Sequence, residues 1–112
     1  MLRECDSPGK EGGEVACGGG VQMTIREMAT VMHHRLPVKL FVLDNGGYLT
    51  IKQTQELGFD GRFMGIDGDS GLSFPDFMKV AESYSFKGVR LTSHQGLKKQ
   101  IQEIMNHDGP VL

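Results

Sequence analysis

The segment 38–43 constrains the fold of this chain more than any other feature of its sequence. It reads Val-Lys-Leu-Phe-Val-Leu and stops abruptly at Asp44-Asn45-Gly46-Gly47. A nearly continuous run of β-branched, aromatic and aliphatic residues is typical of a strand that is buried on both faces, as in a parallel sheet. The segment therefore predicts a strand inside a parallel sheet.

Helical patterns alternate with shorter apolar segments along the rest of the chain. Short strands are expected at 15–17, 88–91 and 111–112. Helices are expected from the capping box Thr24–Glu27 to Pro37, over 48–57, from a Ser73 cap with Pro75 in the first turn, and from a Ser93 cap to 108–110. The alternation predicts an α/β fold in three layers, with a mostly parallel sheet and helices on both faces.

The division into domains follows from the glycine distribution. Residues 1–14 are polar, glycine-rich and without periodicity, and we expect a flexible lead-in there. Residues 15–112 would form one domain, which starts and stops within a strand and so resembles part of a larger fold. Residues 58–71 carry five glycines and predict a long, mobile loop. We expect exposed sheet edges and self-association as one way to cover them.

The composition excludes several classes of protein. Twelve Lys and Arg against fourteen Asp and Glu give a net charge of −2, whereas an electrostatic nucleic-acid binder needs a basic surplus on one face. The longest apolar run is far short of the roughly 20 residues of a membrane span. Residues 1–14 contain no signal-like segment, so a cytoplasmic location is expected. Cys5 and Cys17 do not form a disulfide framework.

Two glycine-rich turns each follow a predicted strand and lead into a helix. This is where open parallel sheets bind anionic ligands. The turn 18–20 lets backbone approach a phosphate, and the turn 44–47 adds side-chain oxygens suited to a hard cation such as Mg²⁺. Each turn taken alone is equally compatible with an ordinary structural turn.

Together and in this order, the two turns resemble a known family. The segments Gly18-Gly19-Gly20-Val21-Gln22-Met23-Thr24-Ile25-Arg26-Glu27, Leu36-Pro37-Val38-Lys39 and Leu43-Asp44-Asn45-Gly46-Gly47-Tyr48 look like the pyrophosphate-binding domain of thiamine-diphosphate enzymes of the acetolactate synthase type. The likeness continues through 73–84 and 107–112 and covers most of the chain from Val15 onward. It implies a thiamine-diphosphate-binding fold.

The resemblance also implies roles for particular residues. The family signature is Gly-Asp-Gly, then a gap of somewhat under thirty residues, then Asn-Asn. Carried over, metal binding falls on the Asn45 side chain and the Gly47 carbonyl, while Gly19, Gly20 and the Gly47–Tyr48 turn would face the diphosphate. The implied cofactors are thiamine diphosphate and Mg²⁺, which would neutralise the phosphates.

This chain lacks the aspartate of the family signature. Cys17 stands at the family's first glycine, and Gly18 stands at its metal-binding aspartate. Mg²⁺ is bound through one or two carboxylates plus phosphate oxygens, so metal binding is expected to be weakened. Asp44 occurs where the family usually has Asn and is a further candidate ligand.

The family's architecture implies a partner. Its cofactor lies between two domains, and the pyrimidine-binding domain supplies the glutamate that activates the cofactor. That domain, or another copy of the chain, is the implied partner. Carboxylates elsewhere, at Glu27, Glu56 and Glu82, are expected on solvated helix faces rather than as catalytic bases.

Two functions follow from the sequence. The chain is either a portion of a thiamine-diphosphate and Mg²⁺-dependent enzyme that acts on carbon–carbon bonds of 2-oxo acids, without catalysis by this portion alone, or a stand-alone, non-catalytic remnant or binding module of the same fold. A nucleotide or flavin binder ranks below both, because no Gly-x-Gly-x-x-Gly motif follows a strand.

Overall fold

The computed structural model describes residues 12–112 and shows an α/β chain. Its elements are β1 (Gly12–Cys17), α1 (Gly18–Thr24), α2 (Glu27–His33), β2 (Val38–Leu43), α3 (Leu49–Gly58), α4 (Phe77–Ser83) and α5 (Leu97–Met105). The α/β class predicted from the sequence is confirmed. Most of the predicted lead-in and Cys5 lie outside the described residues.

The sheet is parallel, as the apolar run at 38–43 predicted. β1 pairs with β2 from Gly12 opposite Val38 to Cys17 opposite Leu43. β1 thus begins three residues before the predicted strand at 15–17, and takes in residues that the sequence assigned to the lead-in.

The residues Val111 and Leu112 extend this sheet beyond β2. Val111 forms parallel bridges to Lys39 on one side and to Lys87 on the other. The Leu40 N–H donates to the Val111 carbonyl (2.9 Å), and the Leu112 N–H donates to the Lys87 carbonyl (2.9 Å). The strand predicted at 88–91 is reduced to this short pairing around residue 87.

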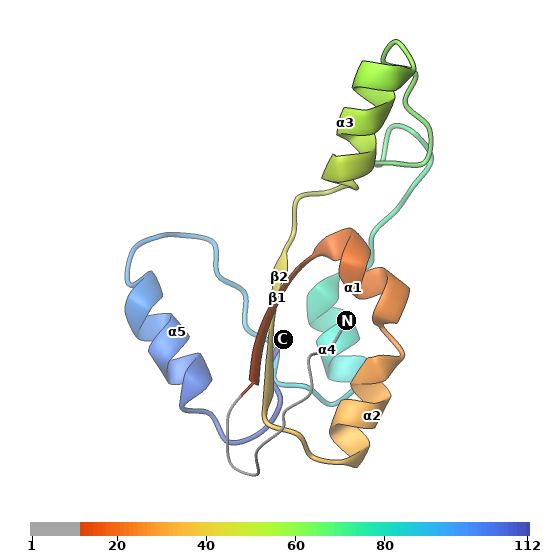
Figure 1. Ribbon diagram of the computed structural model, residues 1–112. Helices are drawn as coiled ribbons and strands as arrows, with labels where there is room; N and C mark the ends of the chain where they lie inside the picture. The colour runs from red at the N-terminus through yellow and green to blue at the C-terminus, as the bar shows by residue number, and fades with distance from the viewer. Residues whose placement is uncertain (1–11) are drawn as a thin grey trace.

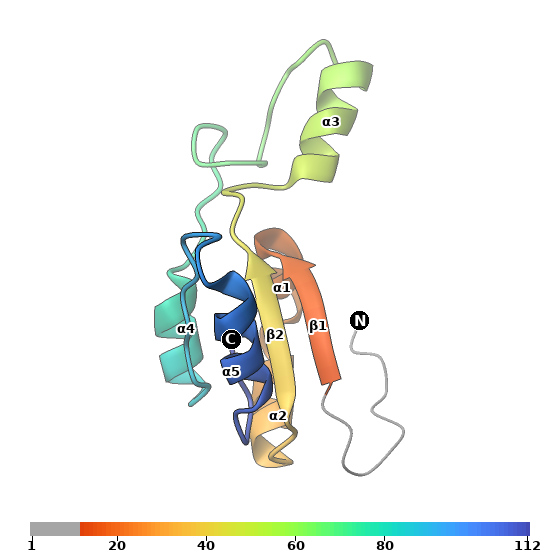
Figure 2. The same cartoon turned by 90° about the vertical axis from the view of Figure 1, so that its left-hand side faces the viewer.

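Helices lie on both sides of the sheet (Figures 1 and 2). α1, α2 and α4 lie against one face, and α5 lies against the opposite face. The main core is on the first side and consists of Met28, Val31, Val38, Ala81 and Phe86. Among the described helices, none is both long and apolar enough to cross a bilayer.

The predicted capping box at Thr24 is wrong. Thr24 is the last residue of α1, and its hydroxyl donates to the Gly20 carbonyl (3.4 Å). The glycine-rich turn itself forms the beginning of α1, which starts at Gly18 directly after β1. α2 begins at Glu27 without a side-chain cap. Of the predicted helix from Thr24 to Pro37, the structure forms only α2, and the segment 18–20, which was predicted as a turn, opens the separate short helix α1.

The predicted caps of the last two helices are also wrong. Asp76, not Ser73, caps α4, where its carboxylate accepts a hydrogen bond from the Met78 N–H (2.9 Å). Gly96 precedes α5 in the left-handed region (φ 68°), which favours glycine. Ser93 instead accepts from the Gln95 N–H in the preceding loop (3.1 Å).

α3 and the loop after it project beyond the carboxyl end of β2, away from the other helices (Figures 1 and 2). None of the residues of α3 is buried. Several large apolar side chains of this projection are exposed: Leu49, Ile51, Leu57, Phe59, Phe63 and Met64. An exposed apolar surface of this kind is typical of a site where another polypeptide packs.

Candidate functional site

The two glycine-rich segments meet at the carboxyl ends of β1 and β2. Cys17 and Leu43 are paired across the two strands, so the residues that follow them in the chain leave the sheet at the same edge. The segment 18–20 opens α1, and 44–48 forms the connection to α3. The structure thus brings together the two segments that the sequence singled out, at the edge where parallel sheets bind ligands.

The ring of Tyr48 joins the two segments directly. Gly18 and Gly19 are buried, and a side chain at position 19 would collide with the Tyr48 ring. The same ring packs against Phe74, with 5.8 Å between the ring centroids. Glycine is therefore required at position 19 by packing against Tyr48. A ligand could approach Gly19 only from a side that the ring does not cover.

Gly18 lies against the aromatic side chains at the start of α4. A Cβ atom added at this position would lie 3.3 Å from the Phe77 ring and 3.8 Å from the Phe74 ring. The first distance is tight but involves only side-chain atoms. A Cβ atom fits here if the Phe77 ring moves by a few tenths of an ångström.

The turn at 45–48 is held in shape from both sides. The Asn45 side-chain oxygen accepts from the Gly47 N–H (3.4 Å), and the Tyr48 N–H donates to the Ile66 carbonyl (2.8 Å). Gly47 is buried, and a Cβ atom there would lie 2.7 Å from the Ile66 carbonyl oxygen. Asn45 and Asp44 are exposed at the surface of this turn.

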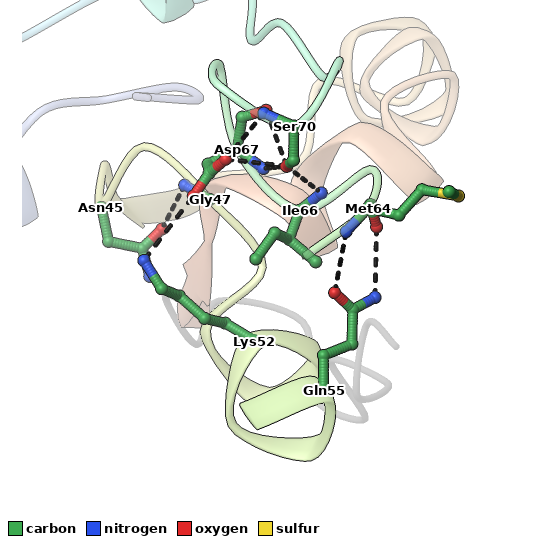
Figure 3. Close-up of polar contacts among 8 residues, drawn as sticks. All are labelled: Asn45, Gly47, Lys52, Gln55, Met64, Ile66, Asp67 and Ser70. Atoms are coloured by element: carbon green, nitrogen blue, oxygen red, sulfur yellow. Dashed lines mark hydrogen bonds and ion pairs between the residues drawn. The ribbon is translucent and has the colours of Figure 1, made fainter. Parts of the chain in front are cut away.

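A polar network that the sequence did not predict supports the turn (Figure 3). One oxygen of Asp67 accepts hydrogen bonds from the Ser70 hydroxyl (2.7 Å) and the Ser70 N–H (3.1 Å). The other oxygen lies 3.6 Å from the Lys52 ammonium. The hydrogen bond from Ser70 is the main cause that lowers the pKa of Asp67, and the charge of Lys52 adds to it. Asp67 also pairs with Gly47 in an antiparallel bridge.

The loop predicted to be mobile is braced against α3. The Gln55 side chain donates to the Met64 carbonyl (3.1 Å) and accepts from the Met64 N–H (2.9 Å). The spacing of Asp67 and Ser70 in a glycine-rich stretch is a common turn pattern. That pattern was the available signal for the network, although it does not indicate contact with α3.

The residues at this site do not fit a Mg²⁺ ion held by the protein. Mg²⁺ requires octahedral oxygen ligands that usually include a carboxylate. Gly18 offers no side chain, Asn45 offers an amide oxygen, and Asp44 is exposed. Within residues 12–112, no three His, Cys, Asp or Glu side chains are grouped closely enough to hold a metal. The metal-ligand roles of Asn45, Gly47 and Asp44 therefore stay predictions.

A groove of about 870 Å³ opens between β2 and α5 and reaches Asp44 and Asn45 at one end. Its walls are mostly apolar and include Leu43, which is 61% exposed. A second apolar residue of the sheet, Val15 in β1, is 67% exposed. The face of the sheet next to α5 is therefore incompletely covered by the described residues.

Comparison with known proteins identifies the family of this chain. Residues 8–112 match the family model described as "Thiamine pyrophosphate enzyme, C-terminal TPP binding domain". The chain is 32% identical over 91 residues to an acetolactate synthase large subunit from Cyanidium caldarium, a match that covers 81% of this chain and 15% of that protein.

Two bacterial relatives show the same pattern. Identity is 34% over 94 residues with the acetolactate synthase large subunit of Haemophilus influenzae, covering 81% of this chain and 16% of the relative. It is 30% over 95 residues with the acetolactate synthase isozyme 2 large subunit of Escherichia coli, covering 84% and 17%. The chain thus spans about one sixth of the length of these relatives. It belongs to the thiamine pyrophosphate enzyme family and matches its C-terminal TPP-binding domain.

Proposed function

We propose that this chain contributes the diphosphate-binding side of a thiamine-diphosphate site in an enzyme of the acetolactate synthase type, and that it does not catalyse the reaction alone. The supporting observation is the meeting of 18–20 with 44–48 at the carboxyl ends of two paired parallel strands. The family and the large-subunit relatives supply the identity of the ligand.

In this proposal the residues of the chain bind and orient the cofactor. Gly19, Gly20, Asn45, Gly47 and Tyr48 would contact the diphosphate at a turn in which the Asn45 side chain accepts from the Gly47 N–H and whose Tyr48 ring packs against Gly19 of α1. When bound, thiamine diphosphate supplies the carbanion chemistry that acts on 2-oxo acids. Pre-shaping the turn lowers the entropy lost on binding.

The proposal includes a partner polypeptide. The exposed apolar side chains of α3 and the open face next to α5 are the surfaces that a pyrimidine-binding domain, or a second copy of the chain, would cover. We propose that the domain predicted at 15–112 includes the whole of β1 and so begins by Gly12, and that the assembly works in the cytoplasm.

Calorimetric titration of the chain with thiamine diphosphate, with and without Mg²⁺, tests this function. Saturable heat that increases after addition of a pyrimidine-binding domain supports an enzyme portion. Absence of heat from a folded sample under all conditions contradicts it.

One observation favours the alternative of a non-catalytic remnant or binding module, namely Gly18 at the position of the family's metal-binding aspartate. The variant Gly18→Asp should create or strengthen Mg²⁺-dependent binding if the remaining site is intact and the Phe77 ring, 3.3 Å from the added Cβ, moves by a few tenths of an ångström. Gly18→Ala is the matched control, since it adds the same Cβ without a carboxylate. Equal binding by both variants would show that the turn no longer forms a metal site.

A further inference from the structure

The network around Asp67 holds a positive charge beside the candidate turn. Lys52 lies in the first turn of α3, where its N–H donates to the Tyr48 carbonyl (2.9 Å). Its ammonium lies 3.6 Å from Asp67 and 5.3 Å from the centre of the Phe63 ring. Two neighbours therefore restrain a side chain that would otherwise be free to move.

The network is rigidly connected to the turn itself. Asp67 pairs with Gly47 across an antiparallel bridge, and the Ile66 carbonyl accepts from the Tyr48 N–H. Ser70 occupies one oxygen of Asp67 with two hydrogen bonds, which leaves the other oxygen for Lys52 (Figure 3). The side chain of Lys52 nevertheless remains 46% exposed. An ammonium has three N–H donors, so donors remain available to a ligand.

A diphosphate bound at this turn requires positive charge from some source. In the family that charge comes from a metal ion, but the residues here do not fit a protein-held Mg²⁺. Asp67 is paired with Lys52 at 3.6 Å, and Asp44 is exposed to solvent, so the ammonium of Lys52 would be shared between Asp67 and a bound diphosphate. Lys52 is the cation held next to the turn by described contacts.

We propose that Lys52 contacts the diphosphate group directly and takes over part of the charge neutralisation, so that this chain binds a diphosphate without a divalent metal. The identity of the natural ligand, thiamine diphosphate, rests on the proposed function. The contact itself concerns the diphosphate group alone. It can therefore be tested with inorganic pyrophosphate.

The test uses the full chain, freed of metal by chelation and dialysis, and titrated calorimetrically with inorganic pyrophosphate. Lys52→Gln removes the charge and should weaken binding by about tenfold or more, the loss expected for one hydrogen bond from a charged donor. Lys52→Arg keeps the charge and should remain within a few-fold of wild type. Lys98→Gln is the matched control, because Lys98 is an exposed lysine on α5.

The outcomes separate this inference from the proposed function. Equal pyrophosphate binding by wild type and Lys52→Gln overturns the inference, as does binding that requires Mg²⁺ or no binding at all. A parallel titration with thiamine diphosphate tests the function independently. If thiamine diphosphate fails to bind while pyrophosphate binds through Lys52, the function falls and the inference stands. Unchanged circular dichroism of each variant confirms that folding is intact.

Discussion

The buried lysine of β2 offers the sharpest test of what holds the sheet together. The Lys39 side chain has no exposed surface. Its ammonium donates to the carbonyls of His107 (2.7 Å) and Gly109 (2.8 Å). These carbonyls belong to the turn between α5 and Val111, which pairs next to Lys39. Lys39 thus holds in place the turn that precedes Val111, the residue that pairs with both Lys39 and Lys87 in the sheet.

The substitution Lys39→Met keeps the shape of the side chain and removes both hydrogen bonds. Bonds from a charged donor stabilise by about 1.5–3 kcal/mol each, so the gross loss is about 3–6 kcal/mol. Two effects reduce it. The charge no longer has to be desolvated, and His107 and Gly109 are only half-buried, so water can reach their carbonyls. We expect a net loss of about 2 kcal/mol out of a typical total of about 5–15 kcal/mol.

Urea unfolding of Lys39→Met should show a midpoint lowered by about 1 M with an unchanged slope. Hydrogen exchange of the Val111 and Leu112 amides should accelerate more than exchange in α2, because the loosening is local. Lys98→Met, on the exposed surface of α5, is the control and should change neither. A Lys39→Met midpoint equal to or above wild type would refute the reasoning, since desolvation would then outweigh the hydrogen bonds.

Two further predictions concern the candidate turn. Gly47→Ala places a Cβ 2.7 Å from the Ile66 carbonyl oxygen and should cost about 1–3 kcal/mol in urea unfolding, whereas Gly58→Ala, with nothing within 4 Å, should be neutral or slightly stabilising. The pKa of Asp67 lies below its ordinary value of 3.8, mainly through the hydrogen bond from Ser70. The contribution of ionised Asp67 to stability is therefore present above that ordinary value and is lost as the pH falls through the lowered pKa. Ser70→Ala should move the pKa of Asp67 back up, as measured by an NMR titration of its carboxyl carbon. An unchanged titration would contradict the role assigned to Ser70.

The sequence correctly predicted elements that are determined by their own residues, such as β2. The bounds of β2 were correct because a nearly continuous run of apolar and β-branched residues favours a strand. The predicted burial of this strand on both faces is not met: only Val38 and Lys39 are buried, and Leu43 is exposed. Helix starts were predicted less well. Thr24, Ser73 and Ser93 are all good capping residues by type, but α1 begins directly at the strand end, and α4 and α5 begin at Asp76 and after Gly96.

The meeting of the two glycine-rich segments was also predictable, since both follow strands of one parallel sheet. The contacts that hold these segments in place were not predictable. Tyr48 covers Gly19 from another segment of the chain, and Lys52 meets Asp67 across an irregular loop. Such contacts depend on how the chain folds back on itself, and periodicity carries no information about that.

The order of pairing in the sheet has a consequence for how the chain folds. Lys39 is joined to residues 68 and 70 positions further along the sequence, and Val111 lies between two segments that both precede it. Closing such long loops costs entropy before any contact is gained. A high contact order slows folding, and we expect milliseconds to seconds rather than the microseconds of a helical bundle of this size. During synthesis, β2 stays without its inner neighbour until residue 111 has left the ribosome, and for that time its apolar surface is open to chaperones.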